Sequence, residues 1–152
     1  MSAQIFVWNR QRKIALDRGR LQHFAERALV GCLALRAPRK SDLASLDEVD
    51  VLFVSDRAIA KLHRDFLGIR GATDVITFQH GEVFISTETA ARYARASGST
   101  LRDELELYVV HGLLHLHGYD DIAVAAARRM QATQNRLVAQ LRSRPARPAG
   151  LK

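Results

Sequence analysis

The sequence contains almost no cysteine and no long run of apolar residues. Cys32 is the only cysteine among 152 residues, so the chain cannot form an internal disulfide framework, which excludes the disulfide-rich secreted class. The thiol lies between Gly31 and Leu33 in an apolar stretch, where it behaves as a small hydrophobe. No segment is long and apolar enough to predict a signal peptide or a membrane-spanning helix. We therefore expect a cytoplasmic protein with no part in a membrane.

Internal repeats are also absent, and the length fits one domain. With 152 residues, of which 47% are hydrophobic, the chain can bury a core without disulfide bonds. Residues 1–142 are therefore expected to form a single domain. Residues 143–152 contain Pro145, Pro148 and Gly150 among basic residues and offer little apolar surface, so we expect a disordered basic tail there.

The formal net charge of +7 is spread unevenly along the chain. Residues 1–40 contain nine lysines and arginines against two acidic residues, residues 41–105 contain seven against eleven, and residues 106–152 contain seven against three. Basic ends of this kind suit a polyanionic partner, because lysine and arginine displace counterions from a phosphate backbone. A solvated arginine-rich surface is the alternative interpretation.

The spacing of apolar residues predicts strands and helices in a definite order. Short alternating or β-branched runs predict strands at 5–8, 49–53, 75–78 and 82–85, the first at a sheet edge and the last two as a hairpin or neighbouring pair. Helical spacing predicts helices over about 20–35, from Ser55 as N-cap to Gly68, from Thr87 to Gly98, over 101–117 and over 122–141. This order predicts an α+β domain in which a small mixed sheet packs with about five helices.

The segment from His111 to Asp121 carries a metal-ligand pattern. His111 and His115 are four residues apart, so a helix places both imidazoles on one face, within about 6 Å of each other. Gly118 can adopt the left-handed conformation that ends the helix and turns the chain, which would bring Asp121 back toward the same ion. A His-His-Asp set leaves one position of a tetrahedral zinc ion open, as in catalytic sites. We therefore predict one divalent metal ion, with zinc as the expected ion, bound by His111, His115 and Asp121.

Other interpretations of this segment stay open. Two helical histidines can simply pack or hydrogen-bond, although the added Gly118 and Asp121 weaken that interpretation. The spacing also matches the long signature of zincin metalloproteases, in which a glutamate follows the first histidine and acts as general base. Gly112 occupies that position here, so a protease of this kind would lack its proton acceptor. His117 lies off the face shared by the two histidines, which indicates a polar rim or supporting residue rather than a ligand.

Two motifs, in the right order, resemble the YbeY family of bacterial endoribonucleases, the rRNA maturation factors. The family's hallmark is His-Gly-x-Leu-His-Leu-x-Gly-Tyr-Asp-His, and every defined position from His111 to Asp120 fits it. Residues 72–78 and 81–86 look like the family's Thr-Asp/Asn-Val-Leu-Ser-Phe and Gly-Asp/Glu-Ile-x-Ile-Ser strands. The order of strands and helices also agrees, so the resemblance covers about residues 5–140.

The chain departs from the family pattern in two places. The third ligand is usually histidine in the family and is Asp121 here; a carboxylate can bind zinc but reduces the Lewis acidity of the ion. The family's Leu-Asn-x-x-Tyr/Trp-Arg segment corresponds to residues 62–67, so Leu67 replaces the arginine to which a phosphate contact is ascribed. Arg64 or Arg70 could make this RNA contact instead, with a solvated helix end as the alternative for each.

The resemblance implies a single-strand-specific, metal-dependent endoribonuclease that matures the 3′ end of small-subunit (16S) ribosomal RNA and takes part in ribosome quality control. Ribosomal RNA and the small ribosomal subunit would then be its partners. The ion would activate water and neutralise charge on the scissile phosphate. No general base is identified; Glu82 and His117 are candidates for proton handling, and Glu82 can equally be an ordinary strand-end residue. A zincin-like metalloprotease and a non-catalytic ribosome-assembly factor with a structural metal are the alternative functions.

Overall fold

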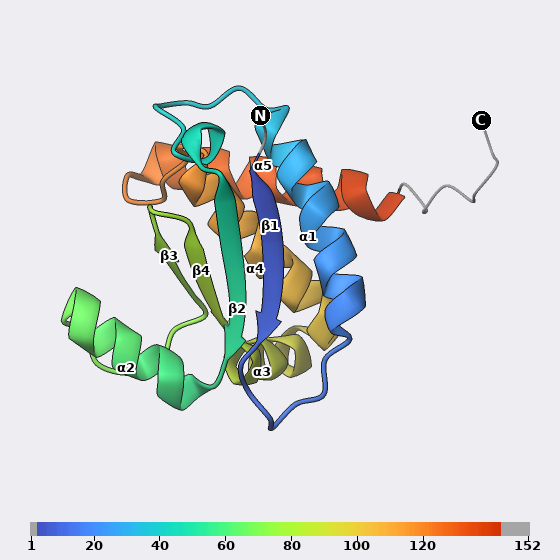
Figure 1. The fold of residues 1–152 in the computed structure, drawn as a ribbon, viewed down its shortest axis with the longest axis vertical. Helices are drawn as coiled ribbons and strands as arrows, with labels where there is room; N and C mark the ends of the chain where they lie inside the picture. The colour runs from blue at the N-terminus through green and yellow to red at the C-terminus, as the bar shows by residue number, and fades with distance from the viewer. Residues whose placement is uncertain (1–2, 144–152) are drawn as a thin grey trace.

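The computed structural model describes residues 3–143, which form a four-stranded sheet and five α-helices (Figure 1). The elements, in chain order, are β1 (Gln4–Asn9), α1 (Arg18–Leu33), a 3-10 turn (Leu43–Ser45), β2 (Glu48–Val54), α2 (Asp56–Leu67), β3 (Val75–Phe78), β4 (Glu82–Ser86), α3 (Thr87–Ser97), α4 (Leu101–Leu116) and α5 (Val124–Ser143). The predicted α+β class with a small mixed sheet is confirmed. Of the tail predicted at 143–152, Ser143 is the last residue of α5, and residues 144–152 lie outside the described residues.

The strands lie in the order β1-β2-β4-β3. β1, β2 and β4 are parallel, and β3 pairs with β4 as an antiparallel hairpin, so both the edge strand and the hairpin predicted from sequence are confirmed. Gly81 in the hairpin turn has a φ of +116°, and a Cβ there would lie 2.7 Å from the carbonyl oxygen of Glu48. Only glycine fits this turn, because it accepts both the positive φ and the close approach of β2.

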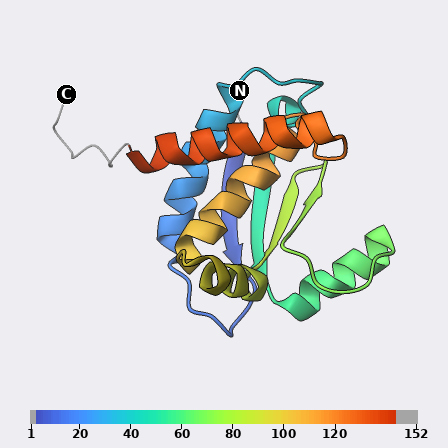
Figure 2. The ribbon, with the colours of Figure 1, turned by 180° about the vertical axis from the view of Figure 1, so that it is seen from behind.

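The main core lies between one face of the sheet and the helices behind it (Figure 2). Alternating side chains of the parallel strands point to this core, including the fully buried Val49, Val51 and Phe53 of β2. α4 contacts α1, α3, α5, β3 and β4, so it lies between the sheet and α5. This central position explains why the apolar residues of α4 are buried almost all round the helix.

The outer edge of β1 is covered by the side chain of Gln22 from α1. Its amide nitrogen donates to the carbonyl oxygen of Ile5 at 2.7 Å, and its amide oxygen accepts from the backbone N–H of Val7 at 2.8 Å. The Arg18 guanidinium donates to the carbonyl oxygen of Val7 at 3.2 Å. These contacts occupy the backbone groups that a neighbouring strand would otherwise bind.

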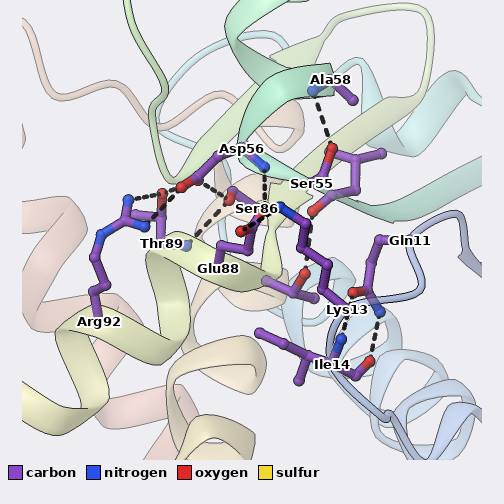
Figure 3. A network of polar contacts seen from close by, with 12 residues as sticks. Gln11, Lys13, Ile14, Ser55, Asp56, Ala58, Ser86, Glu88, Thr89 and Arg92 are labelled. Carbon is purple, nitrogen blue, oxygen red and sulfur yellow. Dashed lines mark hydrogen bonds and ion pairs between the residues drawn. The ribbon is translucent and has the colours of Figure 1, made fainter.

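A polar network joins α2 to α3 where β2 and β4 end (Figure 3). The carboxylate of Asp56 accepts hydrogen bonds from Ser86 at 2.5 Å, Thr89 at 2.7 Å and Arg92 at 2.6 Å. Partial burial favours a higher pKa for Asp56, but the bonds from Arg92, Ser86 and Thr89 together outweigh it and hold the pKa below its ordinary value. The Glu88 carboxylate accepts from the backbone N–H of Asp56, so the first turns of the two helices are bonded to each other.

No helix in residues 3–143 is both long and apolar enough to cross a membrane. Cys32 is fully buried, and this burial raises the pKa of its thiol to about 12. The thiol is therefore protonated at physiological pH and packs as a small apolar group, as its sequence context predicts.

Candidate metal centre

The three residues predicted to bind a metal converge at the C-terminal end of α4. The Nε2 atoms of His111 and His115 lie 3.1 Å apart. Oδ2 of Asp121 lies 3.8 Å from Nε2 of His111 and 3.7 Å from Nε2 of His115. Both imidazoles are partly buried and Asp121 is half exposed. The donor atoms therefore form a compact triangle that faces solvent on one side.

The hydrogen bonds behind the two imidazoles leave both Nε2 atoms free to bind a cation. Nδ1–H of His111 donates to the side-chain oxygen of Gln134 at 2.7 Å, and Nδ1–H of His115 donates to the carbonyl oxygen of Tyr119 at 3.1 Å. These bonds select the tautomer in which each neutral ring carries a lone pair on Nε2. Two facing lone pairs and a carboxylate repel one another unless a cation lies between them.

The donor set fits a tetrahedral divalent ion. Bonds of about 2.0–2.1 Å to a tetrahedral zinc place neighbouring donors about 3.3 Å apart. The observed separations of 3.1, 3.7 and 3.8 Å bracket that value. Two imidazoles and one carboxylate are also ordinary zinc ligands, and three of them leave the fourth position open.

Burial is the main influence on the titration of His115. Loss of solvent lowers the pKa of His115 below its usual value, and the neighbouring His111 acts in the same direction. Asp121 acts in the opposite direction but does not outweigh them. His115 therefore stays neutral to a lower pH than a free histidine, so protons compete weakly with a metal ion for its Nε2 at neutral pH.

The turn that supplies Asp121 depends on Gly118. This residue has a φ of +95°, and its hypothetical Cβ would lie 3.0 Å from the carbonyl oxygen of Arg39. The left-handed conformation predicted for Gly118 is thus confirmed, and it ends α4 at Leu116 with His117 as the cap. The reversal that follows brings Asp121 back to the two histidines.

Gly112 brings α4 close to β4. A Cβ at this position would lie 2.4 Å from Cγ1 of Val83, a separation that packed atoms do not adopt. Glycine at this position therefore allows α4, which carries His111 and His115, to pack closely on the sheet. The same contact leaves no room for the glutamate that a zincin protease carries after its first histidine.

A cavity of about 440 Å³ opens beside the ligands. His111 and Asp121 line it together with Tyr108, one turn earlier on α4, and Asp74, which precedes β3. Burial, and after it the carboxylate of Glu104, raises the pKa of Tyr108, so its hydroxyl stays protonated. Because His111 and Asp121 line this cavity, a substrate group in it can contact these two side chains directly.

The structure does not bring the other candidate residues into contact with the triad. His117 is only 4% exposed, so of the two roles expected for it, polar rim or supporting residue, the rim role is wrong. Its Nε2–H donates to the carbonyl oxygen of Leu35 at 2.7 Å, and its Nδ1 accepts from the hydroxyl of Ser41 at 2.7 Å. Both ring nitrogens are therefore engaged with the loop that follows α1, and neither is directed at a reacting group.

The remaining candidates lie on other elements. Glu82 begins β4 and bonds the imidazole of His80 at 2.7 Å. Arg64 is in the last turn of α2, where it pairs with Asp65 at 3.2 Å, and Arg70 is exposed in the loop after that helix. α2 extends from the end of the sheet opposite the C-terminal end of α4 in both views (Figures 1 and 2). An RNA contact by Arg64 or Arg70 remains a prediction.

Gln134 is the supporting residue that the sequence did not reveal. It lies on α5, 23 residues after His111, and no local spacing links the two. Gln134 is buried, so its side chain cannot leave the bond to His111 without losing a partner. The one sequence signal for such a role is a polar residue on the mainly apolar buried face of α5.

Replacing Gln134 with alanine is expected to lower metal affinity by about 10- to 100-fold, because the His111 ring loses the acceptor that fixes its tautomer and orientation. Competition with a fluorescent zinc chelator measures this change. Gln131→Ala is the matched control, since Gln131 lines the same cavity without bonding His111. Equal affinities for both variants would contradict the assigned role of Gln134.

The fold and the triad together define an α+β protein in which two histidines and an aspartate that could hold a metal ion lie beside a cavity. The model of the Endoribonuclease YbeY family matches residues 6–142. The chain belongs to this family, as its two motifs predict.

Individual relatives agree with this assignment. An endoribonuclease YbeY from Anaeromyxobacter sp. is 44% identical over 93 residues, covering 55% of this chain and 48% of that protein. One from Chlamydia trachomatis serovar L2 is 35% identical over 147 residues, covering 88% of this chain and 85% of that protein. The chain spans 62% of a third relative, from Methylocella silvestris, so several relatives are substantially longer than the matched region.

A solved structure shares the fold. The solution structure of a Thermotoga maritima protein matches 97% of this chain and 99% of its own chain, with a TM-score of 0.64 and 24% sequence identity. The two proteins therefore share the same arrangement of sheet and helices, although their sequences differ at most positions.

Proposed function

We propose that this protein is a metal-dependent endoribonuclease that cleaves single-stranded RNA. Its cellular substrate is the precursor of small-subunit ribosomal RNA, whose 3′ end it matures, and it takes part in ribosome quality control in the cytoplasm. The observation that carries the proposal is the convergence of His111, His115 and Asp121 beside an open cavity in a chain of the YbeY family. The relatives named as endoribonucleases support it.

The ligand chemistry agrees with hydrolysis of a phosphodiester. His111, His115 and Asp121 would hold a divalent ion, which we take to be zinc, and this ion would supply Lewis acidity at the scissile phosphate and activate water. The hydrogen bonds that His111 donates to Gln134 and His115 donates to Tyr119 hold the imidazoles in place, so little reorganisation is needed during the reaction. The basic chain, with a net charge of +7, favours association with a polyanion.

Two other functions fit the site less well. Peptide hydrolysis of the zincin type is disfavoured, because Val83 leaves no space for a glutamate at position 112. A purely structural metal in an assembly factor is disfavoured because Asp121 is 49% exposed and lines a cavity, whereas structural zinc sites are closed by a fourth protein ligand.

Cleavage of a labelled oligoribonucleotide tests the activity. The zinc-loaded protein is expected to cut the single strand, to spare the same sequence in a duplex, and to lose activity in EDTA. His111→Ala is expected to abolish cleavage while the protein still binds ribosomal particles. A His111→Ala protein that cleaves RNA at the wild-type rate would contradict the proposal, and cleavage of casein by the wild type would favour the protease.

The cellular role has its own readout. Cells lacking the protein are expected to accumulate small-subunit RNA precursors with unprocessed 3′ ends, which primer-based mapping of RNA ends detects. Normal RNA ends together with normal ribosome profiles would exclude this role.

A further inference from the structure

The loop that joins α1 to β2 is basic and is fixed against the turn that supplies Asp121. Between residues 34 and 41 it contains Arg36, Arg39 and Lys40 and no acidic residue. We propose that these three side chains, called here the basic loop, bind the phosphodiester backbone of an RNA strand beside the metal centre. The inference rests on the proposed function and adds to it a substrate-binding surface and the residues that form it.

Three side-chain bonds hold this loop to the C-terminal end of α4. His117 bonds the carbonyl oxygen of Leu35 and the hydroxyl of Ser41, each at 2.7 Å. The Tyr119 hydroxyl donates to the carbonyl oxygen of Arg36 at 3.3 Å. His117 is thus a positioning residue for the loop. Since the carbonyl of Tyr119 also accepts from the ligand His115, one residue connects the metal centre to the basic loop.

The backbone of the loop also packs closely on the turn. A Cβ on Gly118 would lie 3.0 Å from the carbonyl oxygen of Arg39 and 3.2 Å from that of Lys40. The Arg39 guanidinium reaches Asp120 at 2.9 Å. Asp120 precedes the ligand Asp121, and consecutive Cα atoms are only about 3.8 Å apart. Arg39 therefore contacts the turn that supplies Asp121.

The charges of this region favour a phosphate. The two positive charges of a divalent ion are offset by Asp121 and its neighbour Asp120, so without Arg39 the turn and the ion are together close to neutral. Arg39 restores positive charge, and Arg129 of α5 lines the same small depression as Arg39. The guanidinium of Arg39 can also bind a phosphate with two parallel hydrogen bonds.

The basic side chains are accessible to such a ligand. Arg36, Arg39 and Lys40 are exposed, and the side chain of Arg39 is 72% exposed. Its ion pair with Asp120, whose side chain is 20% exposed, is open to solvent on the arginine side, and an ion pair at the surface adds little stability. A phosphate can displace Asp120 from Arg39 at low cost. The backbone of the loop is held by hydrogen bonds, whereas its basic side chains are exposed and can change partners. This combination suits binding of a polyanion.

Binding of a fluorescent single-stranded oligoribonucleotide tests the basic loop. Phosphorothioate linkages slow its cleavage by the metal-loaded full-length protein. The double variant Arg36→Ala/Arg39→Ala is expected to raise Kd about 10-fold. It should also lower the slope of log Kd against log salt by about 1.4, because each lost phosphate contact removes about 0.7.

The matched control is Arg12→Ala/Arg57→Ala, which removes the same charge from the opposite end of the sheet. Arg12 follows β1 and Arg57 follows β2, and both are exposed. This control is expected to change Kd by less than about 3-fold and to keep the salt slope. Equal weakening in the two double variants would overturn the basic loop and leave the endoribonuclease intact. A wild type that neither binds nor cleaves the single strand would overturn both.

Discussion

His115→Ala is expected to lose the bound metal ion and RNA cleavage while the protein stays folded. The imidazole of His115 supplies one of three donor atoms, and its Nε2 lies 3.1 Å from that of His111. Two remaining ligands cannot hold a divalent ion tightly, so metal affinity should fall by more than about 100-fold, which exceeds the loss expected from a supporting residue. Elemental analysis after gel filtration gives the metal content, and circular dichroism reports the fold.

The fold should survive because His115 contributes little to the core. Its side chain is 23% exposed, and within residues 3–143 its one hydrogen bond outside the triad goes to the carbonyl oxygen of Tyr119. His23→Ala is the control, since His23 is exposed on α1. Full metal content in His115→Ala, or an equal loss in His23→Ala, would refute the ligand assignment.

Gly112→Ala is expected to destabilise the protein by about 1–3 kcal/mol, because the new methyl group overlaps Val83 in a packed core. For a chain of this size, each kcal/mol lowers Tm by about 2–4 °C. Thermal unfolding followed by circular dichroism measures the shift. The strain should also displace α4 from β4, so metal affinity should fall along with stability.

A second substitution identifies the cause. Val83→Ala removes the Cγ atoms that the new methyl group would meet. The double variant Gly112→Ala/Val83→Ala should therefore be more stable than the sum of the two single effects predicts, by at least about 0.5 kcal/mol. Strict additivity would mean that Gly112 is needed for another reason than its contact with Val83.

The approach of His111 to His115 and the turn after them could be predicted because they depend on local geometry. His111 and His115 share a helix face through their four-residue spacing. Gly118 can adopt a positive φ because glycine has no Cβ, so its conformation could be predicted from the residue type. The same holds for the N-cap at Ser55 and the C-cap at Gly68, which delimit α2 as predicted. Each of these features involves residues that are neighbours in the chain.

The supporting contacts could not be predicted because they join segments far apart in the sequence. Gln134 reaches His111 from another helix, and the partners of His117 lie 76 and 82 residues before it. The helix period places His117 away from the face that carries His111 and His115. It does not predict that the loop after α1 covers His117. Burial of His117, and with it the basic loop, became visible only in three dimensions.

The amide of Gln22 has a consequence for how copies of this protein meet. A parallel sheet that ends in a regular strand offers a row of backbone donors and acceptors on which another chain can polymerise. At β1 the side chain of Gln22 already bonds the carbonyl oxygen of Ile5 and the N–H of Val7. A strand of another molecule therefore cannot form these two hydrogen bonds with β1. Gln22 and Arg18 of α1 together thus leave fewer free backbone groups at this edge of the folded protein, which opposes aggregation through β1.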